Sequence, residues 1–195
     1  MQILFLCGGL GTRLKKISKL IPKGLIEING KPFFDYILNS IEKYKPESLH
    51  FCLGYGSKLY LKYLEKLKYK FKITYSFEDD YDLLGTGGAI KKAINFLDTD
   101  FIVQYGDTVL DFDYNLFYNY HLNNKKSMTM TILSKNKSPE RPNIFCTKDK
   151  KGKLKCLYNK NQPSPNSNYI DYGALAFKRS IFELEKRVKF DLSEV

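Results

Sequence analysis

A glycine-rich turn directly after a short apolar run constrains the fold of this chain more than any other feature. The apolar run, Ile3–Cys7, is typical of a buried strand. The turn, Gly8–Lys15, exposes backbone N–H groups with little side-chain obstruction, and Arg13 and Lys15 add positive charge. A strand that ends in such a turn is typical of proteins that bind a polyphosphate. A tight surface turn is the alternative, and the nearby Lys23 favours the phosphate site.

Spacing excludes the commoner phosphate loops. A P-loop requires Gly-x-x-x-x-Gly-Lys-Ser/Thr, which no part of the chain supplies. A dinucleotide loop requires Gly-x-Gly-x-x-Gly, and its third glycine would fall on Leu14 when counted from Gly9. Counted from Gly85, in a second glycine cluster, it would fall on Ile90. The N-terminal turn is therefore a phosphate-type loop of another kind, with an arginine inside it.

The net charge of +11 first suggests a nucleic-acid partner. However, 28 of the 32 basic residues are lysines, and they are scattered along the chain. Sequence-reading proteins depend more on arginine. We therefore interpret the charge as a solvated surface that also attracts anionic substrates, and we expect no nucleic-acid partner.

Neither a membrane segment nor a metal-binding cysteine cluster is expected. No apolar run approaches the roughly 20 residues that span a bilayer, and the N-terminus lacks signal-peptide features. We expect no membrane association and a cytoplasmic protein. The four cysteines contain no C-x-x-C pair, so zinc and a disulfide framework are both unexpected, and Cys7 and Cys52 are expected to be core thiols.

Strands and helices alternate through the first half of the chain. The expected strands are Ile3–Cys7, Ser48–Leu53, Phe71–Phe77 and Asp100–Tyr105. The expected helices are Pro32–Tyr44, Ser57–Leu67, with Ser57 as a candidate N-cap, and Gly88–Leu97. This pattern predicts an α/β fold with a mostly parallel, Rossmann-like sheet flanked by helices, and ligands at the carboxyl ends of its strands. Both glycine clusters and Asp107 fall in such loops.

The second half changes to strands separated by polar turns. These strands are expected at Met128–Leu133, Asn143–Thr147, Leu154–Tyr158 and Tyr169–Phe177. They predict a small antiparallel extension of the sheet. No internal repeat or linker divides the chain, so residues 1–195 are expected to form a single domain.

Four segments, in order, resemble the sugar-1-phosphate nucleotidyltransferases: Leu6–Leu14, Pro22–Leu25, Leu84–Ala89 and Gly106–Thr108. A weaker match continues through Tyr158–Lys160 and Ile170–Gly173. The chain is most similar to bacterial D-glycero-D-manno-heptose 1-phosphate and mannose-1-phosphate guanylyltransferases. The resemblance implies the nucleotide-diphospho-sugar transferase type of fold. Residues 1–113 would form its nucleotide-binding half and residues 114–195 its sugar-binding half.

The resemblance implies that an NTP, with GTP favoured, reacts with a heptose or hexose 1-phosphate to give an NDP-sugar and pyrophosphate. The product would serve surface polysaccharide synthesis. Because two anions must meet, the reaction needs cationic groups and a magnesium ion more than a nucleophilic side chain. A catalytically weak nucleotide-binding or regulatory subunit is the alternative, and a homodimer is one assembly the resemblance admits.

The resemblance also implies roles for individual residues. Nucleotide binding is expected at Leu6, Gly8, Gly9, Gly11, Thr12, Arg13, Lys23, Gly85, Thr86 and Gly88. Arg13 would hold the β- and γ-phosphates, Lys23 would neutralise charge where the two phosphates meet, and Asp107 would be a catalytic residue and magnesium ligand. Sugar phosphate binding is expected at Lys160, Asp171 and Gly173. For Glu27 and Glu78, site and surface roles both remain open.

The chain departs from the family pattern in three places. Gly24 stands where relatives usually have a proline, which predicts a looser loop around Lys23. Tyr105 stands where many relatives have asparagine. Relatives also continue to a second acidic metal ligand, which the 195 residues do not include; this departure motivates the regulatory alternative.

Overall fold

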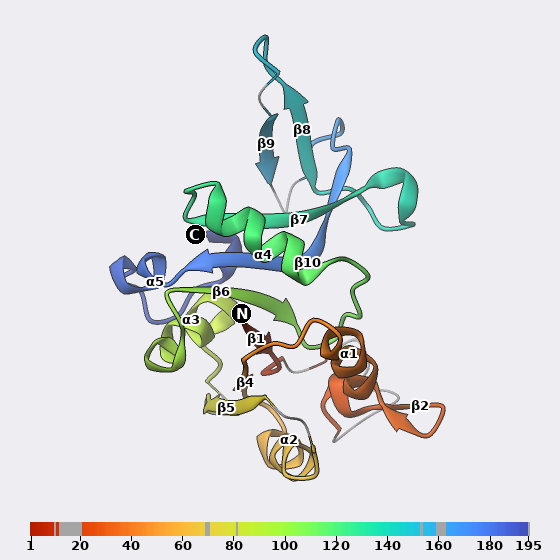
Figure 1. The fold of residues 1–195 in the computed structure, drawn as a ribbon, viewed down its shortest axis with the longest axis vertical. Coiled ribbons are helices and arrows are strands. Elements are labelled where there is room, and N and C mark those ends of the chain that lie inside the picture. The colour runs from red at the N-terminus through yellow and green to blue at the C-terminus, as the bar shows by residue number, and fades with distance from the viewer. Residues whose placement is uncertain are drawn as a thin grey trace. The chain divides into compact units, whose positions relative to one another are not determined.

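The computed structural model describes residues 1–9, 11, 21–68, 71–80, 82–152, 154–158 and 163–194 (Figure 1). They form two compact units. The first comprises Met1–Thr129 and Leu175–Val195, and the second comprises Met130–Ala174. This division differs from the expected halves at residues 1–113 and 114–195, whose separate roles in nucleotide and sugar binding remain predictions.

Four parallel strands form the centre of the first unit. In spatial order they are β5 (Lys72–Phe77), β4 (Ser48–Leu53), β1 (Gln2–Leu6) and β6 (Asp100–Tyr105). Leu6 at the end of β1 lies opposite Cys52 on one side and Tyr105 on the other. The chain passes from β1 to β4 on one side and later to β6 on the other. Open α/β sheets bind ligands at such a reversal, beyond the carboxyl ends of the strands.

Helices pack on both faces of this sheet. They are α1 (Phe33–Glu42), α2 (Ser57–Leu64), α3 (Gly85–Lys92), α4 (Tyr114–Asn123) and α5 (Ser180–Leu184). Phe34 of α1 packs its ring against Phe5 and Phe51, with centroids 5.0 and 5.4 Å away. Cys52, one residue along β4, points to the other face, where its thiol donates to the Ala89 carbonyl of α3. Burial on both faces explains the uninterrupted apolar run in β1.

A small hairpin precedes α1. It pairs β2 (Glu27–Ile28) with β3 (Lys31–Pro32) and follows a 3₁₀ helix, Lys23–Leu25. The two residues between the strands, Asn29 and Gly30, both have positive φ (51° and 74°), as an Asn-Gly hairpin turn requires. Glu27 is exposed on this hairpin.

The second unit is antiparallel. β8 (Ile144–Lys148) pairs with β9 (Leu154–Tyr158) and with β10 (Tyr169–Lys178), and β7 (Met128–Ser134) also pairs with β10. Cys146 and Cys156 lie directly opposite each other on β8 and β9 and form a disulfide. The expectation that the cysteines form no disulfide framework did not anticipate this bond. Strand pairing brings together two cysteines whose spacing along the chain gives no motif.

The α/β class, the parallel sheet and the antiparallel extension are confirmed. β4, β6 and β9 have the predicted bounds. α3 begins at Gly85, three residues earlier than expected, and α4 and α5 were not predicted. Ser57 is not an N-cap: it is the first helical residue, and Gly56 precedes it with φ 74°. Among the residues described, no helix has the length and apolar character needed to cross a membrane.

Candidate active site

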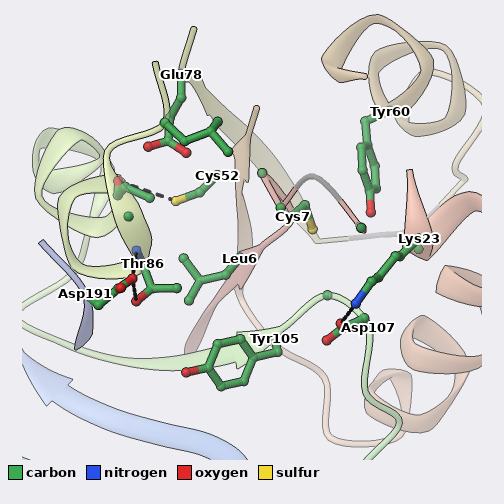
Figure 2. A pocket seen from close by; sticks show the side chains of 18 residues that line it. Leu6, Cys7, Lys23, Cys52, Tyr60, Glu78, Thr86, Tyr105, Asp107 and Asp191 are labelled. Atoms are coloured by element: carbon green, nitrogen blue, oxygen red, sulfur yellow. Dashed lines mark hydrogen bonds and ion pairs between the residues drawn. The ribbon is translucent and has the colours of Figure 1, made fainter. Parts of the chain in front are cut away.

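A pocket of about 220 Å³ opens in the first unit, where β1, β4 and β6 end. Leu6 and Cys7 form its floor together with Cys52, and Gly106 and Asp107 follow β6 on one side (Figure 2). Burial raises the pKa of the Cys52 thiol to about 12, and the pKa of Cys7 is raised for the same reason. Both cysteines are thus neutral core thiols, as predicted, and their surfaces line the pocket.

Lys23 and Asp107 form an ion pair at one end of the pocket. Lys23 Nζ lies 3.0 Å from Asp107 Oδ2, and the two side chains remain 30% and 43% exposed, so a ligand can reach both charges. Figure 2 shows the Lys23 side chain extended toward Asp107. The 3₁₀ helix at Lys23–Leu25 and the loop after β6 supply these two residues.

Gly24 is required by close packing behind this ion pair. A Cβ on Gly24 would meet the Tyr60 hydroxyl and would approach the Gly106 carbonyl oxygen to 2.9 Å. Burial raises the pKa of Tyr60 well above 10, so that hydroxyl is neutral. The expectation that Gly24 loosens the loop was wrong, because Tyr60 and Gly106 occupy the volume a larger residue would fill.

The first glycine loop borders the same pocket. Among the described residues, no atom lies within 4 Å of a Cβ placed on Gly9. Gly11 has φ 58°, and the aliphatic part of Lys23 packs 3.2 Å from its Cβ position. Leu10 and residues 12–20 lie outside the described residues, so the predicted roles of Thr12 and Arg13 are not observed in the structure.

Glu78 and the start of α3 form the other end of the pocket. Glu78 Oε1 accepts a hydrogen bond from the Leu84 N–H at 3.0 Å, and a Cβ on Gly8 would lie 2.8 Å from Oε2. Partial burial raises the pKa of Glu78 above its usual 4.5, while the Leu84 N–H and Lys92 oppose this shift. Glu78 therefore lines the pocket, and its role in binding a ligand remains a prediction.

Asp191 also lines the pocket, and sequence reasoning missed it. Its Oδ1 accepts from the Thr86 N–H and from Thr86 Oγ1, both at 3.1 Å (Figure 2). The two residues are 105 positions apart, so no local pattern connects them. In Figure 2, Asp191 and Thr86 lie across Leu6 from the Lys23–Asp107 pair.

The residues that could hold a cation are few. Among the described residues, no group of three or more His, Cys, Asp or Glu side chains converges on one point. Asp107 Oδ2 contacts Lys23, and Oδ1 has a long contact of 3.4 Å from Thr108 Oγ1. Mg²⁺ is often held by one or two carboxylates, with substrate phosphates and water completing the shell. One carboxylate beside a phosphate site fits that mode of binding.

The structure brings most of the predicted nucleotide-binding residues to one pocket: Leu6, Gly8, Gly9, Gly11, Lys23, Gly85 and Thr86. Asp107, predicted as a catalytic residue and magnesium ligand, lines the same pocket. Gly88 lies next to the C-terminal segment rather than in the described pocket lining. Lys160 lies outside the described residues. Asp171 and Gly173 belong to the second unit, where Asp171 Oδ1 accepts from the Gly173 N–H at 2.9 Å.

A mostly parallel sheet with a glycine loop, a Lys–Asp pair and a carboxylate-lined pocket is the architecture of a nucleotide-binding transferase. The model of the nucleotidyl transferase family matches residues 2–194, and the chain belongs to this family.

Named relatives include two heptose 1-phosphate guanylyltransferases. The D-glycero-alpha-D-manno-heptose 1-phosphate guanylyltransferase of Campylobacter jejuni is 41% identical over 113 residues, which are 58% of this chain and 50% of that protein. The enzyme of the same name from Aneurinibacillus thermoaerophilus is 29% identical over 186 residues, 95% of this chain and 78% of that protein. The chain thus spans half the length of the Campylobacter relative.

The fold is also similar to that of solved structures. HddC from Yersinia pseudotuberculosis has a TM-score of 0.75 and 26% sequence identity, and the match covers 97% of this chain and 82% of HddC. A second structure of HddC, with a TM-score of 0.76, is a complex with GMP-PN.

Proposed function

We propose that this chain transfers a nucleotidyl group from an NTP, with GTP favoured, to a sugar 1-phosphate. A phosphate oxygen of the sugar phosphate attacks the α-phosphorus, the bond between the α-phosphorus and its bridging oxygen breaks, and pyrophosphate leaves. The observation that carries this proposal is the pocket beyond β1, with the Lys23–Asp107 pair at one end and Glu78 at the other. Membership of the nucleotidyl transferase family supports it.

Lys23 is proposed to stabilise the negative charge that accumulates when the two phosphates meet. Its ammonium is already held at the pocket by Asp107, so little reorganisation accompanies substrate binding. Arg13 is proposed to hold the β- and γ-phosphates through its guanidinium donors. No nucleophilic side chain is needed, because the second substrate supplies the attacking oxygen.

Asp107 is proposed to hold a magnesium ion together with substrate phosphates and water. When bound, the ion would neutralise phosphate charge and favour departure of pyrophosphate. Asp107 is the carboxylate at the phosphate end, and its Oδ1 has only the long Thr108 contact among the described residues.

Glu78 is proposed to select guanine. A carboxylate only accepts hydrogen bonds, and guanine presents adjacent N1–H and N2–H donors on one edge. Adenine, uracil and cytosine each combine donors and acceptors there, so they match a carboxylate less well. The Leu84 N–H orients the carboxylate through Oε1, which can accept a second hydrogen bond, so both oxygens can serve the two donors of the base.

The sugar substrate is proposed to be a heptose or hexose 1-phosphate, bound with the help of Lys160, Asp171 and Gly173. Support comes from the two heptose 1-phosphate guanylyltransferases among the relatives. An NDP-sugar of this kind would supply surface polysaccharide synthesis. We expect the protein in the cytoplasm, and a homodimer remains a prediction.

The experiment that tests this function combines four NTPs with several sugar 1-phosphates and Mg²⁺, and measures pyrophosphate release. We expect release only when all three components are present, with GTP preferred. Reactions that omit the sugar phosphate or contain EDTA are the controls. NTP-dependent thermal stabilisation without turnover for any pair would instead support the regulatory alternative.

A further inference from the structure

The C-terminal segment Val188–Glu194 packs against the first turn of α3. The Phe190 carbonyl accepts from the Gly87 and Gly88 N–H groups at 3.0 and 3.1 Å, and the Phe190 N–H donates to the Leu84 carbonyl at 2.9 Å. The first N–H groups of a helix have no partner within the helix, and here another part of the chain supplies their acceptors. These amides are therefore not available to a phosphate.

The glycines of this turn fit the segment closely. A Cβ on Gly87 would meet the ring of Phe190, and one on Gly88 would meet the Val188 carbonyl oxygen. Phe190 itself is only 4% exposed. The close fit places the residue after Phe190, Asp191, in a defined position at the pocket.

Asp191 is anchored through one oxygen. Oδ1 accepts both hydrogen bonds from Thr86, and the Asp191 N–H donates to Glu194 Oε1 at 2.8 Å. The Leu192 N–H in turn donates to Thr86 Oγ1 at 2.8 Å, so the threonine hydroxyl is fixed from both sides. Among the described residues, Asp191 Oδ2 has no hydrogen-bond partner, although the side chain lines the pocket.

We infer that Asp191 is a specificity residue whose Oδ2 accepts a hydrogen bond from a ring hydroxyl of the bound substrate, and that Thr86 is the residue that positions it. This inference rests on the proposed function, because it assigns a group at the same pocket. The hydroxyl belongs either to the ribose of the NTP or to the sugar of the sugar phosphate. Both sources present the same donor chemistry.

The chemistry of the site favours a hydroxyl over the other groups of the substrates. A carboxylate repels phosphate oxygens, and Lys23 lies across Leu6 from Asp191 (Figure 2). Glu78 offers the base a partly buried carboxylate, whereas Asp191 is exposed and suits a hydrated polyhydroxyl group. Hydrogen bonds to an ionised acceptor are stronger than neutral ones, so one such contact can decide between substrates.

The test compares wild-type protein with Asp191→Asn, Thr86→Val and Thr86→Ser. Asp191→Asn keeps an oxygen for Thr86 and removes the charged acceptor. Asp82→Asn is the matched control, because it removes the exposed Lys189–Asp82 contact of 2.8 Å from the same segment without altering the pocket lining. Affinity by calorimetry is measured for GTP, 2′-deoxy-GTP and 3′-deoxy-GTP. KM and kcat are measured with sugar 1-phosphates that differ at single hydroxyls.

We expect Asp191→Asn to weaken one ligand series about 10- to 100-fold, as for loss of one charged hydrogen bond, with little effect on the analogue that lacks the contacted hydroxyl. A loss confined to the GTP series identifies the ribose, and one confined to sugar phosphates identifies the sugar. Thr86→Val should reproduce part of this loss, and Thr86→Ser should restore it.

Two results would overturn the inference: equal weakening of every ligand by Asp191→Asn, or the same effect from Asp82→Asn. If no pair of substrates releases pyrophosphate, the proposed function fails, while the affinities for GTP and its deoxy analogues still test Asp191 on the nucleotide. If those affinities also show no loss specific to one analogue, the inference fails with it. Thermal melting of each variant confirms that it is folded.

Discussion

The two glycine clusters of this chain border one pocket but use the space that glycine leaves in opposite ways. At Gly9 of the first cluster the space is open: a Cβ there would meet no atom of the described residues within 4 Å. Around the second the chain itself fills it, since the carbonyl groups of Val188 and Phe190 lie against Gly88. The same residue type thus admits a ligand at one end of the pocket and another segment of the chain at the other.

This difference distinguishes the end of the pocket that presents charges to a substrate from the end that is closed by packing within the chain. The first cluster lies beside the Lys23–Asp107 pair, where charges remain accessible to solvent and to a substrate. At the second, Phe190 and Asp191 already satisfy the backbone amides that could have bound phosphate. We therefore expect substitutions of the glycines in the first cluster to change ligand binding, and substitutions of the glycines in the second cluster to change stability.

The largest effect is expected from Asp107→Asn. Loss of its charge weakens the proposed magnesium ligand and releases Lys23, and should lower the rate of pyrophosphate release at least about 100-fold, the scale for one preorganised charge contact. Arg13→Ala should have a similar effect. Asp111→Asn, in the same loop but outside the described pocket lining, is the control. Unchanged turnover in both active-site variants would contradict the proposed roles.

A smaller and more discriminating effect is expected from a matched pair, Gly9→Ala and Gly88→Ala. The Gly9 methyl enters open pocket space, so it should weaken nucleotide binding without changing the free energy of unfolding by more than about 0.5 kcal/mol. The Gly88 methyl meets a backbone carbonyl and should cost about 1–3 kcal/mol of stability, despite the helix preference for alanine. Denaturant titration and calorimetry measure the two quantities.

Limited trypsin digestion tests whether Gly88→Ala displaces the C-terminal segment. Arg187 and Lys189 flank Val188, so displacement of the segment should speed cleavage there in Gly88→Ala and leave Gly9→Ala like wild type. Equal stability of the two variants, or faster cleavage in Gly9→Ala, would show that the two clusters do not differ in the way described.

Much of the fold could be predicted because its signals are local. Apolar runs gave β4 and β6 with the correct bounds, and both glycine clusters and Asp107 fell at the carboxyl ends of parallel strands. Helix α4 was missed, since its buried Tyr114 and Phe117 alternate with exposed Leu116 and give weak amphipathicity. Asp113 caps the start of α4, where its carboxylate accepts a hydrogen bond from the Leu116 N–H.

What the sequence could not provide was contact between distant segments. The Thr86–Asp191 hydrogen bonds join residues 105 positions apart, and the Cys146–Cys156 disulfide depends on the register of β8 and β9. The tight packing of Gly24 depends likewise on Tyr60, which a different helix supplies. Such contacts depend on how strands and helices pack, which no short motif specifies.

The smallest effect is expected from a change of pH, and it acts through the Glu78 carboxylate at one end of the pocket. Burial raises the pKa of Glu78 above 4.5, so this carboxylate gains a proton at a higher pH than an exposed glutamate does. Protonation removes an acceptor for the base, and GTP affinity should fall up to about tenfold as pH is lowered from 7 toward 4.5, the loss of one charged hydrogen bond. Glu78→Gln should show lower affinity for GTP and no such additional fall.

Stability must be followed in the same titration because His50 responds to the same change. Burial lowers the pKa of His50 to about 4, with its ring held by Thr74 and Ser76. The unfolded chain therefore takes up this proton first, and stability decreases from about pH 6.5 down to about pH 4. That loss is common to wild type and Glu78→Gln, so the difference between their GTP affinities isolates Glu78. Parallel pH curves for the two proteins would contradict a role for Glu78 in binding the base.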